Sequence, residues 1–402
     1  MHILSMADLP IKGKRILMRV DFNVPVDDRG NVTDDTRITA VIPSIKYILE
    51  KGGCVILMSH FGRPKGSFSK EFSLVPVAEY LEKLIGIKIK FASDCIGSEA
   101  KRLAEALRPG EVLLLENLRF HQAEEHPDKD PEFAKQLAGL GDCYINEAFG
   151  ACHRTHASVV DIVRYFPGAA AAGFLLQKEI RFLSETLTDP KRPFYAIIGG
   201  AKISSKLGVL KALLGKVDAL FIGGGMAYTF YRAEGIEIGD SLFEKDLIPE
   251  AAEILQTAKS KGVPLFLPID NVIADKISPE ASIRTVPVAA GIPKGESGAD
   301  IGPETIELFT EKLQNAKTIL WNGPLGVFEI EAFSKGTKAI AEAITKTPAV
   351  TIVGGGDSIA AIRATGYADK ITHISTGGGA TLEYLEYGTL PGIDALANSD
   401  RG

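Results

Sequence analysis

The sequence predicts an α/β protein with two parallel sheets. Short apolar runs rich in Val, Ile and Leu alternate along the whole chain with polar or glycine-rich stops and longer amphipathic segments, and this pattern is typical of parallel strands connected by helices. At roughly 100 to 200 residues a domain, a chain of 402 residues is long enough for two or three domains. We therefore expect one sheet in each half of the chain.

The apolar runs supply the expected strands. In the first half these are residues 16–20, 55–58, 112–115 and 143–145, and in the second half 195–198, 219–222, 264–267, 318–321, 350–353 and 371–374. Helix signals fit the spacing, because Pro249 opens a segment that Gly262 closes, and Pro303 opens another whose apolar residues fall on one face.

A change in composition marks the boundary between the halves. Residues 167–173 are rich in alanine and glycine, and residues 189–193 hold two prolines. Between them one apolar stripe at helical spacing is formed by Leu176, Ile180, Leu183 and Leu187. Such a helix suits a stiff connector with bending points at its ends, although an ordinary surface helix has the same pattern. We place the domain boundary here.

Charge and composition argue against several classes of partner. The chain has 45 basic and 51 acidic residues, a net charge of -6 and no basic tail, which disfavours non-specific binding to nucleic acid or to an anionic membrane. No apolar run reaches the roughly 18 residues of a membrane helix, and the polar start, residues 1–15, lacks the apolar core of a secretory leader. We expect a cytoplasmic protein.

The four cysteines, Cys54, Cys95, Cys143 and Cys152, contain no C-x-x-C pair and no metal-ligand spacing. Free buried thiols are therefore expected, and neither a zinc site nor a disulfide framework is predicted.

Cations follow the predicted strands of the first half, where ligands bind in open parallel sheets. The residues after these strands include Asp21, Asn23, Arg37, His60, Arg63, Arg119 and Arg154. Guanidinium groups that converge on one cleft repel one another unless an anion compensates them, so the repetition indicates a site for a small polyanion whose hydroxyls face Asp21 and Asn23. Taken singly, each arginine also fits a surface salt bridge, and Asp21 fits an ion pair with one of them.

Glycine follows the predicted strands of the second half. The stops are residues 199–202, 223–225, 354–357 and 377–379. Glycine runs that open helices expose backbone N–H groups to phosphate, and the helix dipole favours the anion, so these stops predict a nucleotide-type site. Neither a P-loop nor a clean G-x-G-x-x-G follows a strand.

Four charged residues complete this second site. Lys202 and Lys206, four apart, can neutralise a transferring phosphoryl group, and Asp357 can hold Mg²⁺. Glu329 is a candidate for ribose hydroxyls. Lys206 also fits an ordinary solvated helix lysine.

The motifs together resemble the phosphoglycerate kinase family over essentially the whole chain. They are Met18–Pro25 (MRVDFNVP), Ser59–Pro64 (SHFGRP), Glu116–Arg119 (ENLR), Asn146–Gly150 (NEAFG), His153–Arg154, Gly199–Lys202 (GGAK), Trp321–Pro324 (WNGP), Gly354–Asp357 (GGGD) and Ser375–Gly379 (STGGG).

The resemblance implies two Rossmann-like three-layer domains joined by a hinge helix. The first, residues 1–173 plus 391–402, would bind 3-phosphoglycerate or 1,3-bisphosphoglycerate. Residues 174–192 would form the connecting helix and hinge. The last, residues 193–390, would bind Mg-ADP or Mg-ATP. Hinge closure and a monomeric state are implied as well.

The resemblance also assigns site residues by matching motif. Substrate binding falls to Asp21, Phe22, Asn23, Arg37, His60, Phe61, Gly62, Arg63, Arg119 and Arg154. Nucleotide binding falls to Gly200, Lys202, Gly224, Asn322, Pro324, Glu329, Gly354, Gly355, Gly356, Asp357 and Ser358, with Asp357 as the metal ligand. The catalytic set is Arg37, Lys202, Lys206, Gly355 and Gly378.

The chain departs from the family pattern in two places. Residues 296–300 read ESGAD where the family usually has Trp-Met-Gly-Leu-Asp, and residues 385–388 read LEYG in place of Leu-Glu-Gly-Lys. Neither change removes a named catalytic group. The first is expected to alter packing near the adenine pocket.

The chemistry agrees with this interpretation. The nucleophile in the ATP-consuming direction is a carboxylate with a pKa near 3.5, already ionised at neutral pH, so no general base is needed. Catalysis then depends on positioning and charge neutralisation.

Two alternatives belong to other classes. A nicotinamide-dependent dehydrogenase would show a glycine fingerprint followed by an acidic residue about 20 positions on. A non-catalytic relative would have lost Arg37, Lys202 or Asp357, and all three are present.

Overall fold

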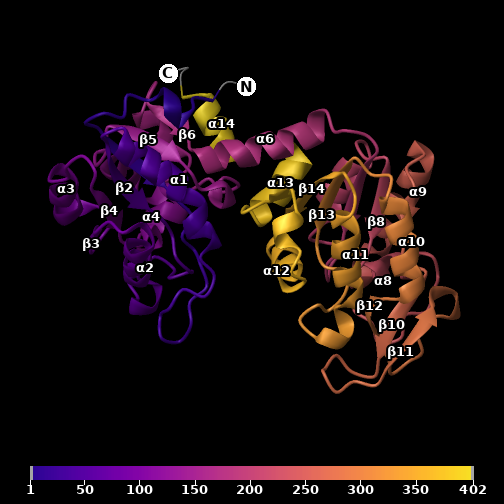
Figure 1. The fold of residues 1–402 in the computed structure, drawn as a ribbon. Helices are drawn as coiled ribbons and strands as arrows, with labels where there is room; N and C mark the ends of the chain where they lie inside the picture. The colour runs from indigo at the N-terminus through magenta and orange to yellow at the C-terminus, as the bar shows by residue number, and fades with distance from the viewer. Residues whose placement is uncertain (1–2, 400–402) are drawn as a thin grey trace. The chain divides into compact units, whose positions relative to one another are not determined.

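The computed structural model describes residues 3–399, apart from the side chain of Leu187, which belongs to the predicted stripe and lies outside the description. Residues 1–2 and 400–402, at the ends of the expected first domain, lie outside it too. Contacts divide the chain into two compact units (Figure 1): Met1–Arg181 with Thr389–Gly402, and Phe182–Gly388. We call them the first and second unit.

The first unit is built on a six-stranded parallel sheet with the order β3-β4-β2-β1-β5-β6. Its strands are β1 (Arg15–Arg19), β2 (Cys54–Met58), β3 (Ile89–Ala92), β4 (Val112–Leu115), β5 (Cys143–Asn146) and β6 (Ala170–Ala172). Its helices are α1 (Thr36–Glu50), α2 (Val75–Ile85), α3 (Gly97–Glu105), α4 (Gln122–Glu125), α5 (Glu132–Ala138) and α14 (Pro391–Ala397).

Alternation along the strands of this sheet sends side chains to two faces. On β1, Ile16 and Met18 point into a core shared with α1 and α2, so Leu17 and Arg19 point to the opposite face. Arg19 is fully buried there. A buried guanidinium at the end of a strand is therefore held next to the loops that follow the sheet.

The second unit contains another six-stranded parallel sheet, with the order β15-β14-β13-β7-β8-β9. Its strands are β7 (Phe194–Ile198), β8 (Ala219–Ile222), β9 (Leu265–Phe266), β13 (Thr318–Asn322), β14 (Val350–Gly354) and β15 (His373–Ile374). Its helices are α7 (Leu207–Leu213), α8 (Ala227–Ala233), α9 (Ile248–Lys261), α10 (Pro303–Leu313), α11 (Lys335–Thr345), α12 (Gly356–Ala364) and α13 (Gly379–Tyr387).

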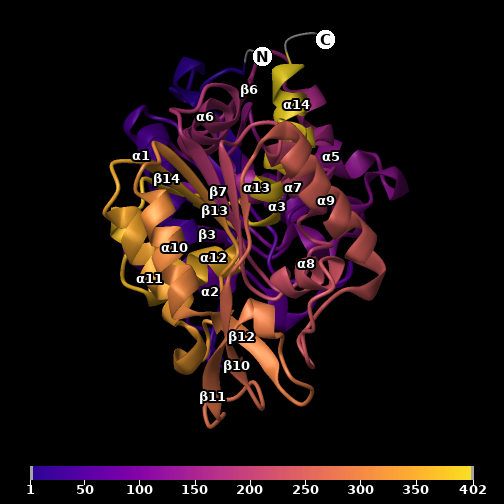
Figure 2. The same ribbon diagram turned by 90° about the vertical axis from the view of Figure 1, so that its right-hand side faces the viewer.

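Helices cover both faces of this second sheet. One face forms a core with α10, α11 and α12 around Trp321 and Phe221. Figure 2 shows α8 and α9 on the opposite side of β7 and β13 from α10 and α11. Pro303 begins α10, and Gly262 ends α9 in the left-handed conformation, so both predicted helix signals are confirmed.

Short 3₁₀ turns connect these elements. They are η1 (Met6–Asp8), η2 (Lys70–Phe72), η3 (Leu118–Phe120), η4 (Pro127–Lys129), η5 (Phe149–Ala151) and η6 (Asp161–Tyr165) in the first unit, and η7 (Lys245–Leu247), η8 (Val288–Ala290), η9 (Glu331–Phe333) and η10 (Ala368–Lys370) in the second.

Helix α6 (Phe174–Thr188) is shared between the units, because the division falls after Arg181. At its start the buried carboxylate of Glu147 accepts from the amides of Leu175 and Leu176 at 3.0 and 3.1 Å. Farther along, Phe182 stacks on His373 of β15 at 4.4 Å between ring centroids. Each unit thus holds its own part of the helix.

The two parallel sheets confirm the predicted fold class, but several elements differ from expectation. Residues 167–173, for which no strand was predicted at the end of the first domain, contain the buried strand β6, which pairs with β5. Strand β3 was not predicted, and the strands expected at 264–267 and 371–374 shorten to β9 and β15.

A small antiparallel sheet in the second unit was also missed. Its order is β11-β10-β12, from β10 (Asp270–Ala274), β11 (Ile283–Pro287) and β12 (Ser297–Ile301). Most of β11 is exposed, so its sequence carries no apolar run. No helix among the described residues is long and apolar enough to cross a membrane.

Candidate active site

The first candidate site lies at the carboxyl ends of β1, β2, β4 and β5. These are the four central strands of the first sheet, and β3 and β6 form its edges. Arg37, in the first turn of α1, donates to the carbonyl of Asn23 at 2.7 Å and lies 3.4 Å from the carboxylate of Asp21. The side chain of Asn23 accepts from the amide of Gly62 at 2.9 Å. These bonds join the loops after β1 and β2, so the structure brings Asp21, Asn23, Arg37 and Gly62 together.

Arg119 connects a third loop to the same place. Its Nη1 donates to the carbonyl of Gly62 at 2.9 Å. Its Nε lies 3.1 Å from Glu125 Oε1 but is not aligned for a hydrogen bond, and it is buried without a hydrogen-bond partner. Burial lowers the pKa of Arg119, with further contributions from Arg19 and Arg154. Such a buried unpaired donor is costly unless a ligand accepts from it.

His60 lies between these cations. Its pKa is well below the ordinary value because it is buried, and because the charges of Arg19, Arg119 and Arg37 oppose a further positive charge. Nη2 of Arg19 is 3.2 Å from Nδ1 of His60. Since a guanidinium only donates, Nδ1 accepts and the ring proton is on Nε2. His60 is therefore a neutral N–H donor.

Two further histidines belong to this cluster and were not assigned from the sequence. Burial and neighbouring arginines lower the pKa of His153 to about 4 and that of His156 to about 3. The Nδ1 atoms of both are buried without a hydrogen-bond partner. Their position on either side of Arg154 was the available signal. For Arg19, also missed, the signal was a charge inside an apolar strand.

The remaining predicted residues of this site fall into two groups. Arg63 and Arg154 are exposed, and Arg154 is near enough to lower the pKa of both His153 and His156. The side chains of Phe22 and Phe61 are in the core, where their amides donate to Ser59 and Asn117. Their side chains therefore support the loops from behind.

The second candidate site consists of two cavities in the second unit. The larger holds about 480 Å³, and its lining includes Gly200, Gly224, Pro324, Glu329 and Asp357. The smaller holds about 310 Å³, and its lining includes Gly200, Lys202, Lys206, Gly355, Gly356, Asp357, Ser358 and Gly378. Both volumes are in the range of small-molecule sites. Except for Asn322 and Gly354, each predicted nucleotide residue thus lines at least one of these two cavities, which share Gly200, Ala201 and Asp357 in their walls.

Asn322 and Gly354 line neither cavity but hold the smaller one in place. Asn322 Nδ2 donates to the carbonyl of Gly354 at 2.6 Å, and its Oδ1 accepts from Lys206 Nζ. Ser358 accepts from the amide of Gly323 at 2.5 Å. Burial lowers the pKa of Lys206 to about 8, partly offset by Asp357. The lysine is therefore a positioned, partly dehydrated group, unlike a solvated helix lysine.

Backbone geometry shapes the smaller cavity. Gly355 caps α12 with φ +94°, and Gly378 caps α13 with φ +54°, conformations that side chains other than glycine rarely adopt. Both helices begin at this cavity, and the N-terminal ends of helices favour anions. Amides, dipoles and two lysines together form a cradle for phosphate.

The larger cavity has mostly apolar walls, including Leu242 and Val327, with Glu329 at its edge. One wall is β12, so the departure at residues 296–300 lies beside the cavity, as expected. Asp300 on this wall accepts from the amides of Gly336 and Ile301 at 2.7 and 2.9 Å. Burial still raises its pKa to about 7. The space therefore suits a planar apolar group.

Comparison with known proteins agrees with this geometry. The family model of phosphoglycerate kinase matches residues 6–387. The phosphoglycerate kinase of Moorella thermoacetica is 54% identical over 393 residues, covering 98% of each chain. The cytosolic enzyme of Triticum aestivum is 52% identical over 395 residues, 98% of this chain and 97% of that protein.

Solved structures give the same result. Phosphoglycerate kinase from Coxiella burnetii has a TM-score of 0.88 and 40% identity over 99% of both chains. That from Pyrococcus horikoshii has a TM-score of 0.86 and 32% identity, covering 99% of this chain and 100% of the other. Since the family model and these relatives span nearly the whole sequence, the chain belongs to the phosphoglycerate kinase family.

Proposed function

We propose that the first unit binds the phosphoglycerate and the second unit binds the nucleotide. The enzyme is a glycolytic phosphotransferase, which moves a phosphoryl group between the acyl phosphate of 1,3-bisphosphoglycerate and ADP to give 3-phosphoglycerate and ATP. The assignment to particular residues rests on the geometry of the two candidate sites.

One observation carries the assignment of the first unit. The buried atoms Arg119 Nε, His153 Nδ1 and His156 Nδ1 have no hydrogen-bond partner among the described residues, although Arg119 and His156 lie near Glu125 and Glu124. Arg119 and His156 are also close enough to His60 to lower its pKa. A phosphate and a carboxylate on one small molecule would supply the missing acceptors and compensate the clustered charge. Arg63 and Arg154 add exposed cations at the edge of the same site.

The second unit suits a nucleotide because its cavities differ in character. The apolar walls of the larger cavity fit a base, and Glu329 fits ribose hydroxyls. The cradle of Lys202, Lys206 and the helix starts at Gly355 and Gly378 fits the phosphates. Asp357 lines both cavities and therefore lies where the base-binding and phosphate-binding parts meet.

The same position makes Asp357 the proposed ligand of Mg²⁺. Magnesium prefers oxygen donors and is commonly held by one or two carboxylates together with substrate phosphates. Asp357 supplies an exposed carboxylate beside the phosphate cradle, so the residues fit the ion. When bound, Mg²⁺ would neutralise charge on the phosphates.

Catalysis by these residues consists of positioning and charge stabilisation. The carboxylate of 3-phosphoglycerate is ionised at neutral pH and needs no base. Arg37 and Lys202, with the amides near Gly355 and Gly378, would stabilise the charge on the migrating group. In-line transfer requires reacting atoms about 3–3.5 Å apart, so we expect the units to approach each other during turnover, with α6 (Phe174–Thr188) as the hinge.

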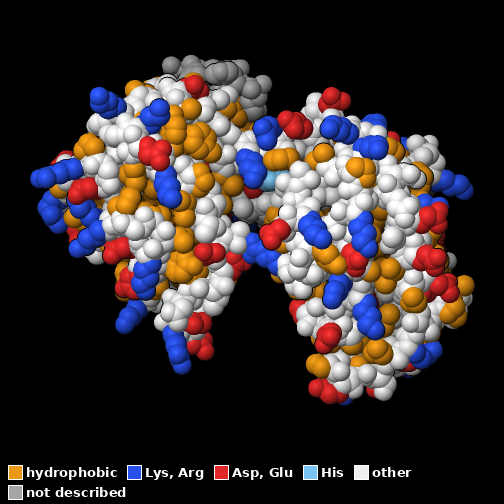
Figure 3. All heavy atoms as spheres, viewed as in Figure 1, with side chains coloured by type: hydrophobic (Ala, Val, Ile, Leu, Met, Phe, Trp, Pro, Cys, Tyr) orange, Lys and Arg blue, Asp and Glu red, His pale blue; other side chains and the backbone are white. Residues whose placement is uncertain are grey.

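A monomeric, cytoplasmic enzyme that binds neither nucleic acid nor membrane completes the proposal. Figure 3 shows acidic and basic side chains interspersed on the visible face of both units. Nucleic-acid binding would require a continuous basic surface, and none is seen on that face.

The test is to incubate the enzyme with Mg-ATP and 3-phosphoglycerate and to trap acyl phosphate as the hydroxamate. We expect a signal that disappears when either substrate or Mg²⁺ is omitted. Asp357→Asn should raise the Mg²⁺ concentration needed for half-maximal rate and leave the KM for 3-phosphoglycerate unchanged. An unchanged Mg²⁺ requirement would exclude Asp357 as the ligand, and a signal without Mg²⁺ would exclude the metal.

A further inference from the structure

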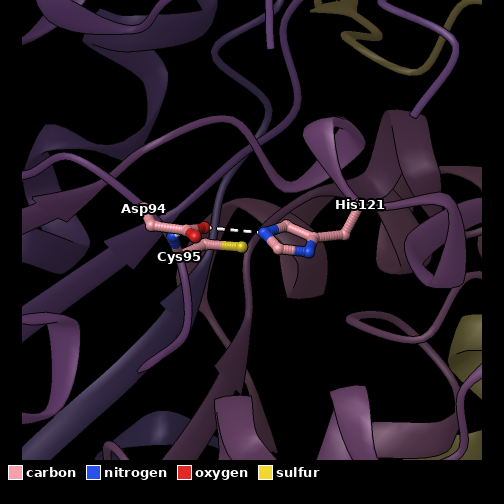
Figure 4. A group of neighbouring side chains, drawn as sticks. All are labelled: Asp94, Cys95 and His121. Atoms are coloured by element: carbon pink, nitrogen blue, oxygen red, sulfur yellow. Dashed lines mark hydrogen bonds and ion pairs between the residues drawn. The ribbon is translucent and has the colours of Figure 1, made fainter. Parts of the chain in front are cut away.

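A side-chain cluster in the first unit serves neither substrate in the proposed mechanism. Asp94 and Cys95 lie between β3 and α3, and His121 follows η3 at the start of α4. Strands β3 and β4 are parallel neighbours, so the segments that leave their carboxyl ends meet. Figure 4 shows the carboxylate, thiol and imidazole converging on one point.

The three donor atoms are close enough to share one ion. One atom from each of Asp94, Cys95 and His121 lies within 4.8 Å of the others. Ligand atoms around a tetrahedral zinc ion lie roughly 3 to 4 Å apart, given bonds of about 2.0 to 2.3 Å. His121 Nε2 and Asp94 Oδ1 are already 2.7 Å apart. Small side-chain rotations therefore suffice to place all three around an ion.

The surrounding structure holds these residues in place. The ring of His121 packs on buried Phe133 of α5, with centroids 5.3 Å apart. The amide of Cys95 donates to Asp94 Oδ1 at 2.6 Å. Although burial alone raises the pKa of Asp94, hydrogen bonds from His121 and from the amides of Cys95 and Ile96 bring it below its usual value. The carboxylate is therefore ionised and oriented without any ion.

The three side chains differ in their exposure to solvent, which gives an ion a route to the buried thiol. Cys95 is fully buried, and burial, together with the charges of Asp94 and Glu124, keeps the pKa of its thiol well above the ordinary value. The side chains of Asp94 and His121 are 48% and 30% exposed. An ion can thus enter from solvent past these two, and its charge would offset the cost of a buried thiolate.

From this geometry we propose that Asp94, Cys95 and His121 form a binding site for a thiophilic divalent cation of the zinc class. The donor set selects this class, because sulfur and imidazole nitrogen suit zinc whereas Mg²⁺ and Ca²⁺ take oxygen ligands. The fourth position, on the exposed side, takes a water molecule. This site is separate from the Mg²⁺ ligand Asp357, which lies in the other unit.

Binding at this site releases one proton. The ion takes the place of the Cys95 thiol proton, which leaves to solvent, and it occupies the lone pair of His121 Nε2, so that the single ring proton resides on Nδ1. Because metal ligands must be deprotonated, affinity rises with pH, by about tenfold per pH unit for one released proton.

The test uses Co²⁺ as a coloured substitute for zinc, titrated into full-length, tag-free protein without nucleotide and with a phosphine reductant. We expect a sulfur-to-cobalt charge-transfer absorption that saturates at one ion per chain and disappears when Zn²⁺ is added. Cobalt bound only by oxygen, for example at Asp357, gives no such band.

Three variants and one matched control decide the outcome. Cys95→Ala should abolish the band, whereas Cys143→Ala, which removes another buried thiol, should retain it. His121→Ala and Asp94→Asn, at partly exposed positions, should weaken Co²⁺ binding at least about tenfold. Loss of a residue that only supports a metal ligand already lowers metal affinity by about 10- to 100-fold. If circular dichroism shows that Cys95→Ala is unfolded, the affinities of His121→Ala and Asp94→Asn for Co²⁺ test the proposal in its place. No band in the native chain, a band that survives Cys95→Ala in folded protein, or unchanged affinity in both other variants would overturn the proposal.

Discussion

The two candidate sites offer different groups to the anions that we propose bind there. In the first unit the groups are side chains: Arg37 extends from the first turn of α1, and Arg119 and three histidines extend from segments that follow β2, β4 and β5. In the second unit they come largely from the backbone, where glycine turns start α12 and α13, and two lysines and Asp357 add charge. A side chain can be truncated without changing the backbone conformation, whereas substituting the glycine of such a turn displaces the backbone.

The electrostatics of the units differ as well. In the first unit, clustered arginines and burial keep the histidines neutral. In the second, burial moves Lys206 toward its neutral form and keeps Asp300 protonated to about pH 7. The first unit thus concentrates permanent charge on arginines, whereas the second combines Lys202 and Asp357 with dipoles and with two groups that titrate near neutrality.

The largest expected effect comes from removing one cation from each site. Arg37→Ala and Lys202→Ala should each lower kcat by about 10²- to 10³-fold, the range for loss of one group that stabilises transition-state charge. Fluorescence or calorimetric titration should show that Arg37→Ala weakens 3-phosphoglycerate binding alone and Lys202→Ala weakens ADP binding alone.

Exposed residues of the same type serve as controls. Arg164→Ala and Lys259→Ala remove one cation from each unit away from the sites and should leave kcat within error of the native value. If Lys202→Ala weakened binding of both substrates equally, the proposed division of substrates between the units would be wrong.

The second prediction sets the pH dependence of the two units against each other. The pKa values of His153 and His156 are about 4 and about 3 in the folded unit, below the unfolded value near 6.5. Their contribution to stability is complete above pH 6.5 and is lost as the pH falls toward the folded values. Asp300, raised to about 7, contributes fully below its unfolded value near 3.9 and loses its contribution as the pH rises through 7.

Between about pH 4 and 6.5 the two units should therefore respond in opposite directions. Each pKa unit corresponds to about 1.4 kcal/mol, so each group contributes on the order of a few kcal/mol. Hydrogen exchange by mass spectrometry, corrected for intrinsic rates, should show the first unit losing protection from pH 7 to about 5.5 while the second gains it. Asp300→Asn should flatten only the second response, and the exposed control Asp246→Asn should change neither. Parallel responses would contradict the assignment.

The third prediction tests the backbone site with two adjacent glycines. A Cβ on Gly355 would meet Asn322 Nδ2 at 2.7 Å in a backbone with φ +94°, whereas a Cβ on Gly356 meets nothing within 4 Å. Gly355→Ala should introduce about 1–3 kcal/mol of strain, displace Asn322 and Lys206, and weaken ADP binding about tenfold or more. Gly356→Ala leaves the backbone unstrained, so it should lose less ADP affinity than Gly355→Ala and gain up to about 1 kcal/mol of helix stability. Calorimetric titration and thermal unfolding distinguish them, and equal losses in both would show that the conformation of Gly355 is not the cause.

What the sequence could predict follows from the range of the interactions involved. Cations and glycines directly after apolar runs were visible because a strand and its loop are neighbours in sequence. Arg19, His153 and His156 carry weak local signals, but the pKa shifts of the two histidines come first from burial, with Arg19 and Arg119 from distant segments adding to the neighbouring Arg154. A local pattern does not contain the burial. Strand β6 was not predicted because its alanines are buried partly by α14, more than two hundred residues away.

The zinc-class cluster shows the same limit. Asp94 and Cys95 precede His121 by a helix and a strand, so neither a C-x-x-C pair nor any short spacing joins the three ligands. Only the adjacency of β3 and β4 brings them together. Sheet order is a long-range property, and a single sequence contains little information about it.

The smallest effect tests whether titration near neutrality is confined to the nucleotide site. With a pKa of about 8, Lys206 is largely neutral at pH 9. At that pH its amine must take up a proton from solvent before it can bind the phosphates as a cation. The Kd for ADP should therefore weaken about tenfold from pH 7 to 9, whereas binding of 3-phosphoglycerate should stay constant, because its cations are arginines, charged throughout this range. Calorimetric titrations above pH 7.5, where the phosphates of ADP no longer titrate, would separate the two. Lys206→Arg should flatten the ADP profile by holding its charge, and Lys206→Met should weaken binding at every pH. A profile that persists in both variants would place the titrating group elsewhere and remove the contrast between a permanently charged site and a titratable one.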